Sequence, residues 1–131
     1  MTWIVAYIAA AVAFGILDAI WLGWAGENFY RPRLVDMLAD SFRMMPALVF
    51  YAAYIAGICW FAVRPGLASG IGTAALNGAL LGALCYATYD LTNQATMRQW
   101  STTITVVDIA WGAFATAVAA SIATFAATRL G

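Results

Sequence analysis

Apolar residues fill four long stretches of the chain, and short polar segments separate these stretches. An α-helix needs roughly 20 mostly apolar residues to cross a hydrocarbon core of about 30 Å. We therefore predict an all-α membrane protein, a four-transmembrane-helix bundle that forms one domain over residues 1–131. The predicted helices cover about residues 2–26, 46–64, 69–97 and 102–129.

Proline and polar residues mark several of the predicted helix ends. Pro46 suits the first turn of the second helix, and Pro65 predicts the point where that helix stops. Polar residues surround Trp100 between the third and fourth stretches, a pattern typical of a short turn at the membrane surface.

A polar segment separates the first two helices, and residues 33–43 within it have an amphipathic helical pattern. We expect a short interfacial amphipathic helix here, either as a connector that rests on the membrane or as a lid over a site. Its apolar face would carry Leu34, Leu38 and Phe42, and its charged face Arg33, Asp36, Asp40 and Arg43.

The composition limits the functions that the chain can have. Hydrophobic residues make up 65% of the 131 residues and charged residues 9%, whereas a soluble domain is about 25% charged. The formal net charge is zero and the six basic residues are scattered, so we predict no nucleic-acid partner. The first stretch lacks a basic leading segment, so we expect a retained helix and not a cleaved signal peptide.

The sequence also offers few groups for chemistry. It has no histidine, which excludes haem or metal ligation and catalysis by imidazole. Cys59 and Cys85 fall inside apolar stretches, where a thiol behaves as a small hydrophobic group. We predict no cofactor and no metal. Aspartates with Asn93 could offer oxygen ligands to Mg²⁺ or Ca²⁺, but no cation-binding loop motif accompanies them.

Three aspartates, Asp18, Asp90 and Asp108, fall inside the predicted helices. A carboxylate within a span costs roughly 2.5 kcal/mol or more, and such residues usually face the bundle interior and serve a function. The first and third helices run antiparallel to the fourth. At about 1.5 Å of rise per residue, all three aspartates should therefore lie roughly 10 Å below the same membrane face. We predict one site that contains all three as catalytic candidates.

Arginines at the same face are candidate counter-charges for this site. They flank the first and third connections, whereas two other arginines, Arg64 and Arg129, belong to the opposite face. By the positive-inside rule, the site should open to the cytoplasm and both termini should lie outside it. The four arginines near the site are Arg31, Arg33, Arg43 and Arg98.

Aromatic and polar residues near the aspartates are candidates for substrate binding. A tryptophan follows both Asp18 and Asp108 three positions later. Because the two helices are antiparallel, we expect these indoles to form aromatic walls at two different depths. The predicted substrate-binding residues are Trp21, Tyr86, Tyr89, Asn93 and Trp111.

The spacing of Gly78 and Gly82 matches the small-xxx-small pattern of closely packed helices. We expect a contact within the chain, with a homodimer interface as the alternative. The aspartates also have a purely structural interpretation, in which they pair with arginines or hydrogen-bond nearby hydroxyl and amide groups to fix the helix register.

Three motifs contain the aspartates: LDAIWLG around Asp18, YATYDLTNQAT around Asp90 and VDIAWG around Asp108. In these motifs, in length and in predicted helix count, the chain resembles the domain of unknown function 2177 family of bacterial predicted membrane proteins. The resemblance extends over essentially the whole chain. It implies a multi-pass protein of the bacterial cytoplasmic (inner) membrane and leaves the activity open.

Three functions fit these features, and the sequence does not decide whether the protein is an enzyme. The first is binding or modification of a membrane lipid or an acyl or isoprenoid chain, with paired carboxyls as general acid and base. The second is a small proton- or cation-coupled transporter, which would need to dimerise. The third is a structural or accessory subunit. The predicted partners are accordingly membrane lipids, with a homodimer or another membrane protein as alternatives.

Overall fold

The computed structural model describes residues 1–33 and 44–131, and these residues form helices with short turns and no strand. The predicted interfacial helix over residues 33–43 lies, apart from its first residue, outside the described residues. The elements are α1 (Thr2–Ala25), η1 (Gly26–Tyr30), α2 (Arg31–Arg33), α3 (Met44–Ile58), η2 (Cys59–Val63), α4 (Arg64–Ser69), α5 (Ile71–Thr96) and α6 (Thr102–Leu130).

Four helical segments are long and apolar enough to cross a membrane, which confirms the predicted all-α architecture with four spans. Two of them are composite, because α1 continues through η1 into α2, and α3 continues through η2 into α4. The segments are Thr2–Arg33, Met44–Ser69, Ile71–Thr96 and Thr102–Leu130.

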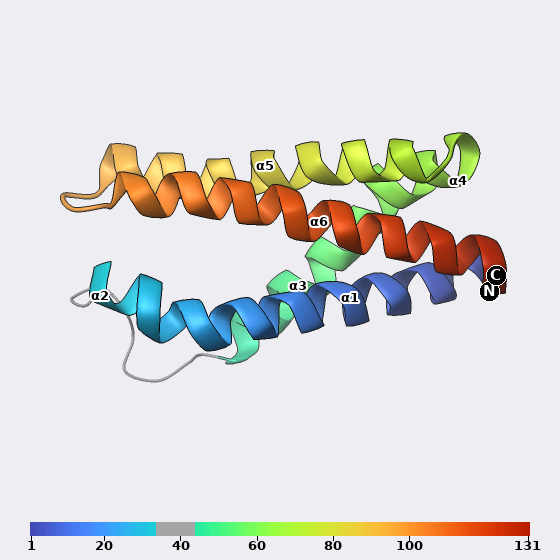
Figure 1. Ribbon diagram of the computed structural model, residues 1–131, viewed down its shortest axis with the longest axis horizontal. Coiled ribbons are helices and arrows are strands. Elements are labelled where there is room, and N and C mark those ends of the chain that lie inside the picture. The colour runs from blue at the N-terminus through green and yellow to red at the C-terminus, as the bar shows by residue number, and fades with distance from the viewer. Residues whose placement is uncertain (34–43) are drawn as a thin grey trace.

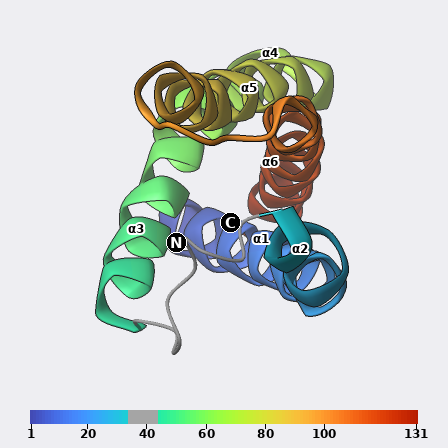
Figure 2. The same cartoon turned by 90° about the vertical axis from the view of Figure 1, so that its left-hand side faces the viewer.

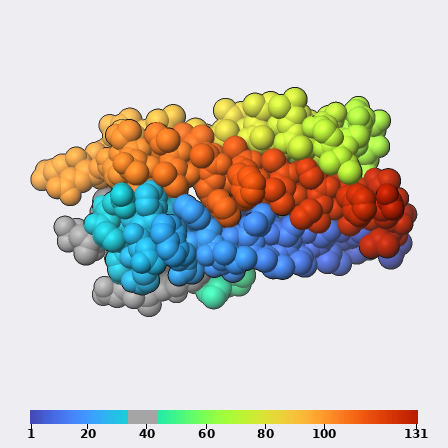
Figure 3. Space-filling model, viewed as in Figure 1, coloured from blue at the N-terminus to red at the C-terminus, as the bar shows by residue number. Residues whose placement is uncertain are grey.

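The helices surround a common core. Helix α6 lies beside both α1 and α5, and the two chain termini meet at one end of the bundle (Figure 1). The α5–α6 turn and α2 lie at the opposite end, and seen from that end α3 lies across the bundle from α6 (Figure 2). The surface atoms of α1 and α6 are in contact along one face (Figure 3).

The second span does not stop at Pro65, where the sequence predicted its end. Cys59–Val63 form a π-helical turn, and Pro65 falls in the first turn of the helix that follows it. Pro65 has no N–H to donate to the preceding turn, and the carbonyl oxygen of Phe61, four residues earlier, accepts the side-chain N–H of Asn77 at 3.2 Å instead. The span ends at Gly70, whose positive φ of 111° is readily adopted only by glycine.

The first span is also longer than predicted. Its helix continues past Gly26 through a π-helical turn, Gly26–Tyr30, into Arg31–Arg33. The sequence predicted that this helix ends at about residue 26 and that a polar segment follows it. The extension matters because it carries an additional aromatic residue, Tyr30, to the end of the bundle.

Small residues allow α5 and α6 to approach closely. A Cβ added at Gly78 would lie 2.8 Å from the carbonyl oxygen of Thr116, and one added at Gly82 would collide with the backbone of Gly112. Both predicted glycines therefore pack within the chain, against α6. Next to this contact, the hydroxyls of Tyr54 and Thr116 share a buried hydrogen bond of 2.7 Å that ties α3 to α6.

We expect Gly82→Ala to destabilise the bundle by about 1–3 kcal/mol, because its methyl group would force the α5 and α6 backbones apart. Thermal unfolding in a mild detergent would measure this. Gly72→Ala is the matched control, since a Cβ at Gly72 of the same helix meets nothing within 4 Å. Equal melting temperatures for the two variants would contradict the importance of the glycine contact.

Candidate functional site

A cavity of about 670 Å³ lies at the end of the bundle that holds the α5–α6 turn. Residues from α1, η1, α2, α3, α5 and α6 line it, together with Trp100 of the turn. They are Asp18, Trp21, Leu22, Gly26, Glu27, Tyr30, Arg31, Phe50, Cys85, Tyr86, Tyr89, Trp100, Ile104, Asp108 and Trp111.

The three predicted aspartates have different positions relative to this cavity. Asp18 and Asp108 line it and are buried, with 7% and 8% of their surface exposed. Asp90 does not line the cavity and is completely buried behind it, with its carboxyl beside that of Asp108. Within the described part of the chain, no three acidic or cysteine side chains converge closely enough to hold a metal ion.

Tyr30 connects the aromatic lining to Asp108. Its hydroxyl donates a hydrogen bond to Asp108 Oδ1 and accepts one from Trp21 Nε1 at 3.1 Å. The π-helical turn places this tyrosine over the cavity, and π-turns often occur at functional sites. The sequence analysis missed Tyr30, although the apolar pair Phe29–Tyr30 inside a polar segment could have signalled a buried contact.

The indoles of Trp21 and Trp111 stack face to face, with ring centroids 4.8 Å apart and an interplanar angle of 14°. The prediction of aromatic walls at two depths was therefore wrong. The two rings, one from α1 and one from α6, form a single stacked wall and not two separate ones. Asp18 lies beside Trp111. The Nε1 of Trp111 nevertheless has no hydrogen-bond partner among the described residues.

The predicted binding residues on α5 are only partly in the cavity. Tyr86 and Tyr89 line it, and the ring of Tyr89 meets that of Trp100 edge-on at 6.1 Å. Asn93 does not line it, and its backbone oxygen instead accepts the N–H of Met97 at the end of α5.

A polar network around Gln94 fixes the α5–α6 turn. Its amide nitrogen donates to Thr102 and its amide oxygen accepts from Thr105. The hydroxyl of Thr105 also accepts the indole N–H of Trp100 at 3.1 Å. This network holds Trp100 at the rim, and the sequence analysis did not identify it.

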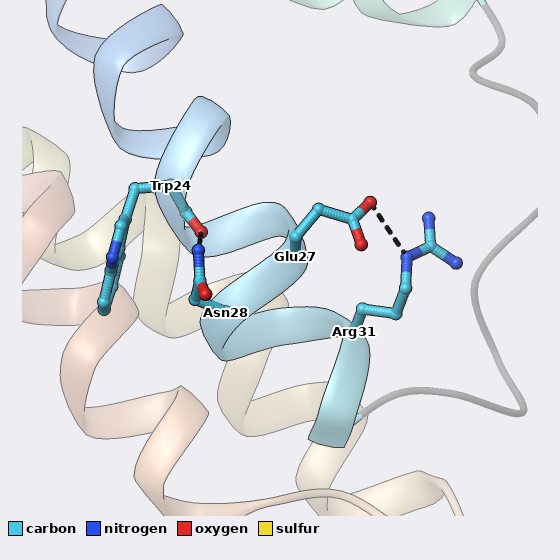
Figure 4. A network of polar contacts seen from close by, with 4 residues as sticks. All are labelled: Trp24, Glu27, Asn28 and Arg31. Atoms are coloured by element: carbon cyan, nitrogen blue, oxygen red, sulfur yellow. Dashed lines mark hydrogen bonds and ion pairs between the residues drawn. The ribbon is translucent and has the colours of Figure 1, made fainter.

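None of the described arginines forms the expected ion pair with an aspartate. Arg31 lines the cavity but pairs with Glu27 at 3.3 Å, which is the only ion pair among residues 1–33 and 44–131 (Figure 4). Arg33 stacks on the ring of Phe29 and donates to its backbone oxygen. Arg43 lies outside the described residues.

The family of the chain follows from its similarity to known proteins. Residues 3–125 match the family described as Predicted membrane protein (DUF2177). The chain belongs to this family. Membership agrees with the four candidate spans, and it confirms the family that the three aspartate motifs indicated. No curated protein and no solved structure matches the chain.

A second, apolar groove of about 450 Å³ lies between α1 and α3. Small side chains on α1 form its floor, and a Cβ added at Gly15 would meet nothing within 4 Å. Leu22 lines both this groove and the aspartate cavity, so the two adjoin. The groove residues are Tyr7, Ala11, Gly15, Ala19, Leu22, Leu48, Tyr51, Ala52 and Ile55.

We expect Tyr30→Phe to destabilise the protein by about 1–3 kcal/mol, because Trp21 Nε1 loses its acceptor and Asp108 its donor. Thermal unfolding followed by tryptophan fluorescence would measure the loss. Tyr89→Phe serves as control, since this exposed cavity tyrosine has no side-chain hydrogen bond to the described residues. Its stability should change by no more than about 0.5 kcal/mol. Equal stability of both variants would show that the Tyr30 hydroxyl contributes nothing.

Proposed function

We propose that the protein binds or modifies a membrane lipid, whose polar end occupies the aspartate cavity and whose acyl or isoprenoid chain lies in the α1–α3 groove. The observation that carries this proposal is the junction at Leu22, which lines both spaces. A cavity with two buried carboxyls that adjoins a groove without charged side chains matches the two chemically distinct ends of a lipid.

The dimensions of the groove support this assignment. Its residues on α1 extend from Tyr7 to Leu22, about 22 Å along the helix at about 1.5 Å per residue. One leaflet of the hydrocarbon core is about 15 Å thick. The groove is therefore long enough to hold one chain of a lipid in that leaflet.

The cavity also borders a pair of carboxyls, Asp108 in its lining and Asp90 buried next to it, that could perform acid–base chemistry. Asp90 is fully buried, its oxygens receive no hydrogen bond from the described residues, and its neighbour is the carboxyl of Asp108. A neutral Asp90 that donates toward Asp108 leaves the smallest uncompensated charge in this apolar setting. Asp108, the member of the pair that lines the cavity, would then be the base of a lipid-modifying step, and Asp90 would hold the proton that the pair shares.

The proposed location is the bacterial cytoplasmic membrane, with the cavity toward the cytoplasm. Of the described arginines, Arg31, Arg33 and Arg98 belong to the cavity end, and Arg64 and Arg129 to the end with the chain termini. Positive residues favour the cytoplasmic side of a membrane, so both termini would lie outside the cytoplasm.

We expect Gly15→Leu to abolish lipid retention without unfolding the protein, because the new side chain fills the groove and meets no existing atom at its Cβ. Native mass spectrometry of protein extracted with its surrounding bilayer would measure the bound lipid. Gly23→Leu is the matched control, since Gly23 is equally open on the same helix but lines neither space.

Loss of a specific lipid in Gly15→Leu alone would support the proposal. If wild type and both variants carry only bulk lipid while melting at equal temperatures, the lipid function is wrong. Proton release on adding a substrate would then indicate a transporter, and a protein partner retained in mild detergent would indicate an accessory subunit.

Asp90→Asn separates binding from modification. Asparagine has nearly the same shape and can still donate toward Asp108, but it cannot exchange a proton. We expect this variant to retain the lipid and to lose any lipid species that wild type produces, as measured by lipid mass spectra of both strains. Identical spectra with equal retention would show that the protein binds its lipid without chemically changing it.

A further inference from the structure

We propose that the aspartate cavity recognises a positively charged headgroup, an alkylammonium group attached to an apolar chain. This inference rests on the proposed lipid function and adds the chemical class of the ligand. It follows from the juxtaposition of two buried carboxyls and a wall of aromatic rings in one cavity.

The charge of the lining favours a cation. Three carboxyl groups and one guanidinium line the cavity, and the guanidinium of Arg31 is paired with Glu27. Asp18 and Asp108 therefore keep no basic partner among the described residues. An anionic headgroup would bring further negative charge next to them, whereas an ammonium group would supply the missing counter-charge in a setting of low dielectric constant.

The aromatic lining favours the same ligand. Seven of the 15 lining residues are aromatic, and they come from α1, η1, α3, α5, α6 and the α5–α6 turn. Faces of tryptophan and tyrosine attract organic cations, and aromatic cages of this kind recognise quaternary ammonium groups. The stacked rings of Trp21 and Trp111 line the cavity, and so do the rings of Tyr86 and Trp100.

The buried neighbour of Asp108 bears on the charge that the ligand would meet. Both carboxyl oxygens of Asp90 are completely buried and accept no hydrogen bond from any described residue. Buried carboxyls without a donor are costly. Asp90 lies against Asp108, and with Asp90 neutral the pair carries one negative charge, which a cation at the cavity face of Asp108 would offset.

The test compares amphiphiles that differ in their headgroups. Purified protein in bilayer discs of phosphatidylglycerol would receive equal amounts of phosphatidylethanolamine, phosphatidylcholine or hexadecyltrimethylammonium, and native mass spectrometry would count the bound molecules. We expect at least about tenfold enrichment of an ammonium-bearing molecule over phosphatidylglycerol. The first two probes represent zwitterionic phospholipids, and the third a simple cationic amphiphile, so the test identifies the source of the ammonium group.

Substitutions in the cavity test whether the preference for an ammonium headgroup depends on its carboxyls. Asp108→Asn and Asp18→Asn should each lower the enrichment to about twofold or less, because asparagine keeps the shape and loses the charge. Two variants keep the test decisive if one fails to fold, as checked by its melting temperature. Gly23→Leu, outside the cavity and the groove, should keep the full preference.

The results separate this inference from the proposed function. If a lipid binds, is lost in Gly15→Leu and shows no preference for ammonium heads, the lipid site stands and the cationic headgroup is wrong. If no lipid binds, the proposed function fails. In that case tetramethylammonium, which has no apolar chain, should still quench the cavity tryptophans in wild type and not in Asp108→Asn. Absence of that quenching would overturn the cation site as well.

Discussion

The close approach of α5 and α6 at Gly82 and Gly112 determines where the site residues of these two helices lie. Each glycine packs against the backbone of the other helix, and the ring of Tyr86 lies directly on Gly112. Asp108 precedes Gly112 by one helical turn, and Asp90 follows Gly82 by about two turns on the antiparallel partner. Without a side chain at either glycine, the two aspartates are brought together in the interface between these helices.

The other wall of the cavity depends on α1 and on its π-helical extension. The π-turn adds residues to the helix without breaking it, so that Tyr30 reaches Asp108 while Trp21 reaches both Tyr30 and Trp111. The backbone N–H of Arg31 donates to the carbonyl oxygen of Gly26 across this turn, so pairing within the helix continues here, as a bilayer requires. The fold thus combines a rigid glycine contact on one side with a locally widened helix on the other.

The sequence predicted the helical architecture well because hydrophobic length is a direct consequence of membrane thickness. It also predicted one site for Asp18, Asp108 and four aromatic residues, and in the structure these residues line one cavity. The aspartates could be singled out because a charged residue inside a span is informative by itself. It failed at Pro65 and Tyr30 because π-helical turns have no simple sequence pattern. It failed on the Trp21–Trp111 geometry because side-chain reach, and not backbone depth, decides where two indoles meet.

The arrangement of charges is best understood by asking which group balances each buried carboxyl. Glu27 is exposed and has Arg31 as its partner, so the ion pair of this region stabilises the rim and not the interior. Asp108 has the hydroxyl of Tyr30, which offers one hydrogen bond but no positive charge. Among residues 1–33 and 44–131, Asp18 lies near the indole of Trp111, and Asp90 lies beside the carboxyl of Asp108. A protein that needed these acids solely for helix register would gain more from neutral hydrogen-bonding side chains, which avoid the cost of burying charge. This imbalance is the reason for proposing a positively charged, chain-bearing ligand, because such a ligand would supply the charge that Tyr30 and Trp111 do not.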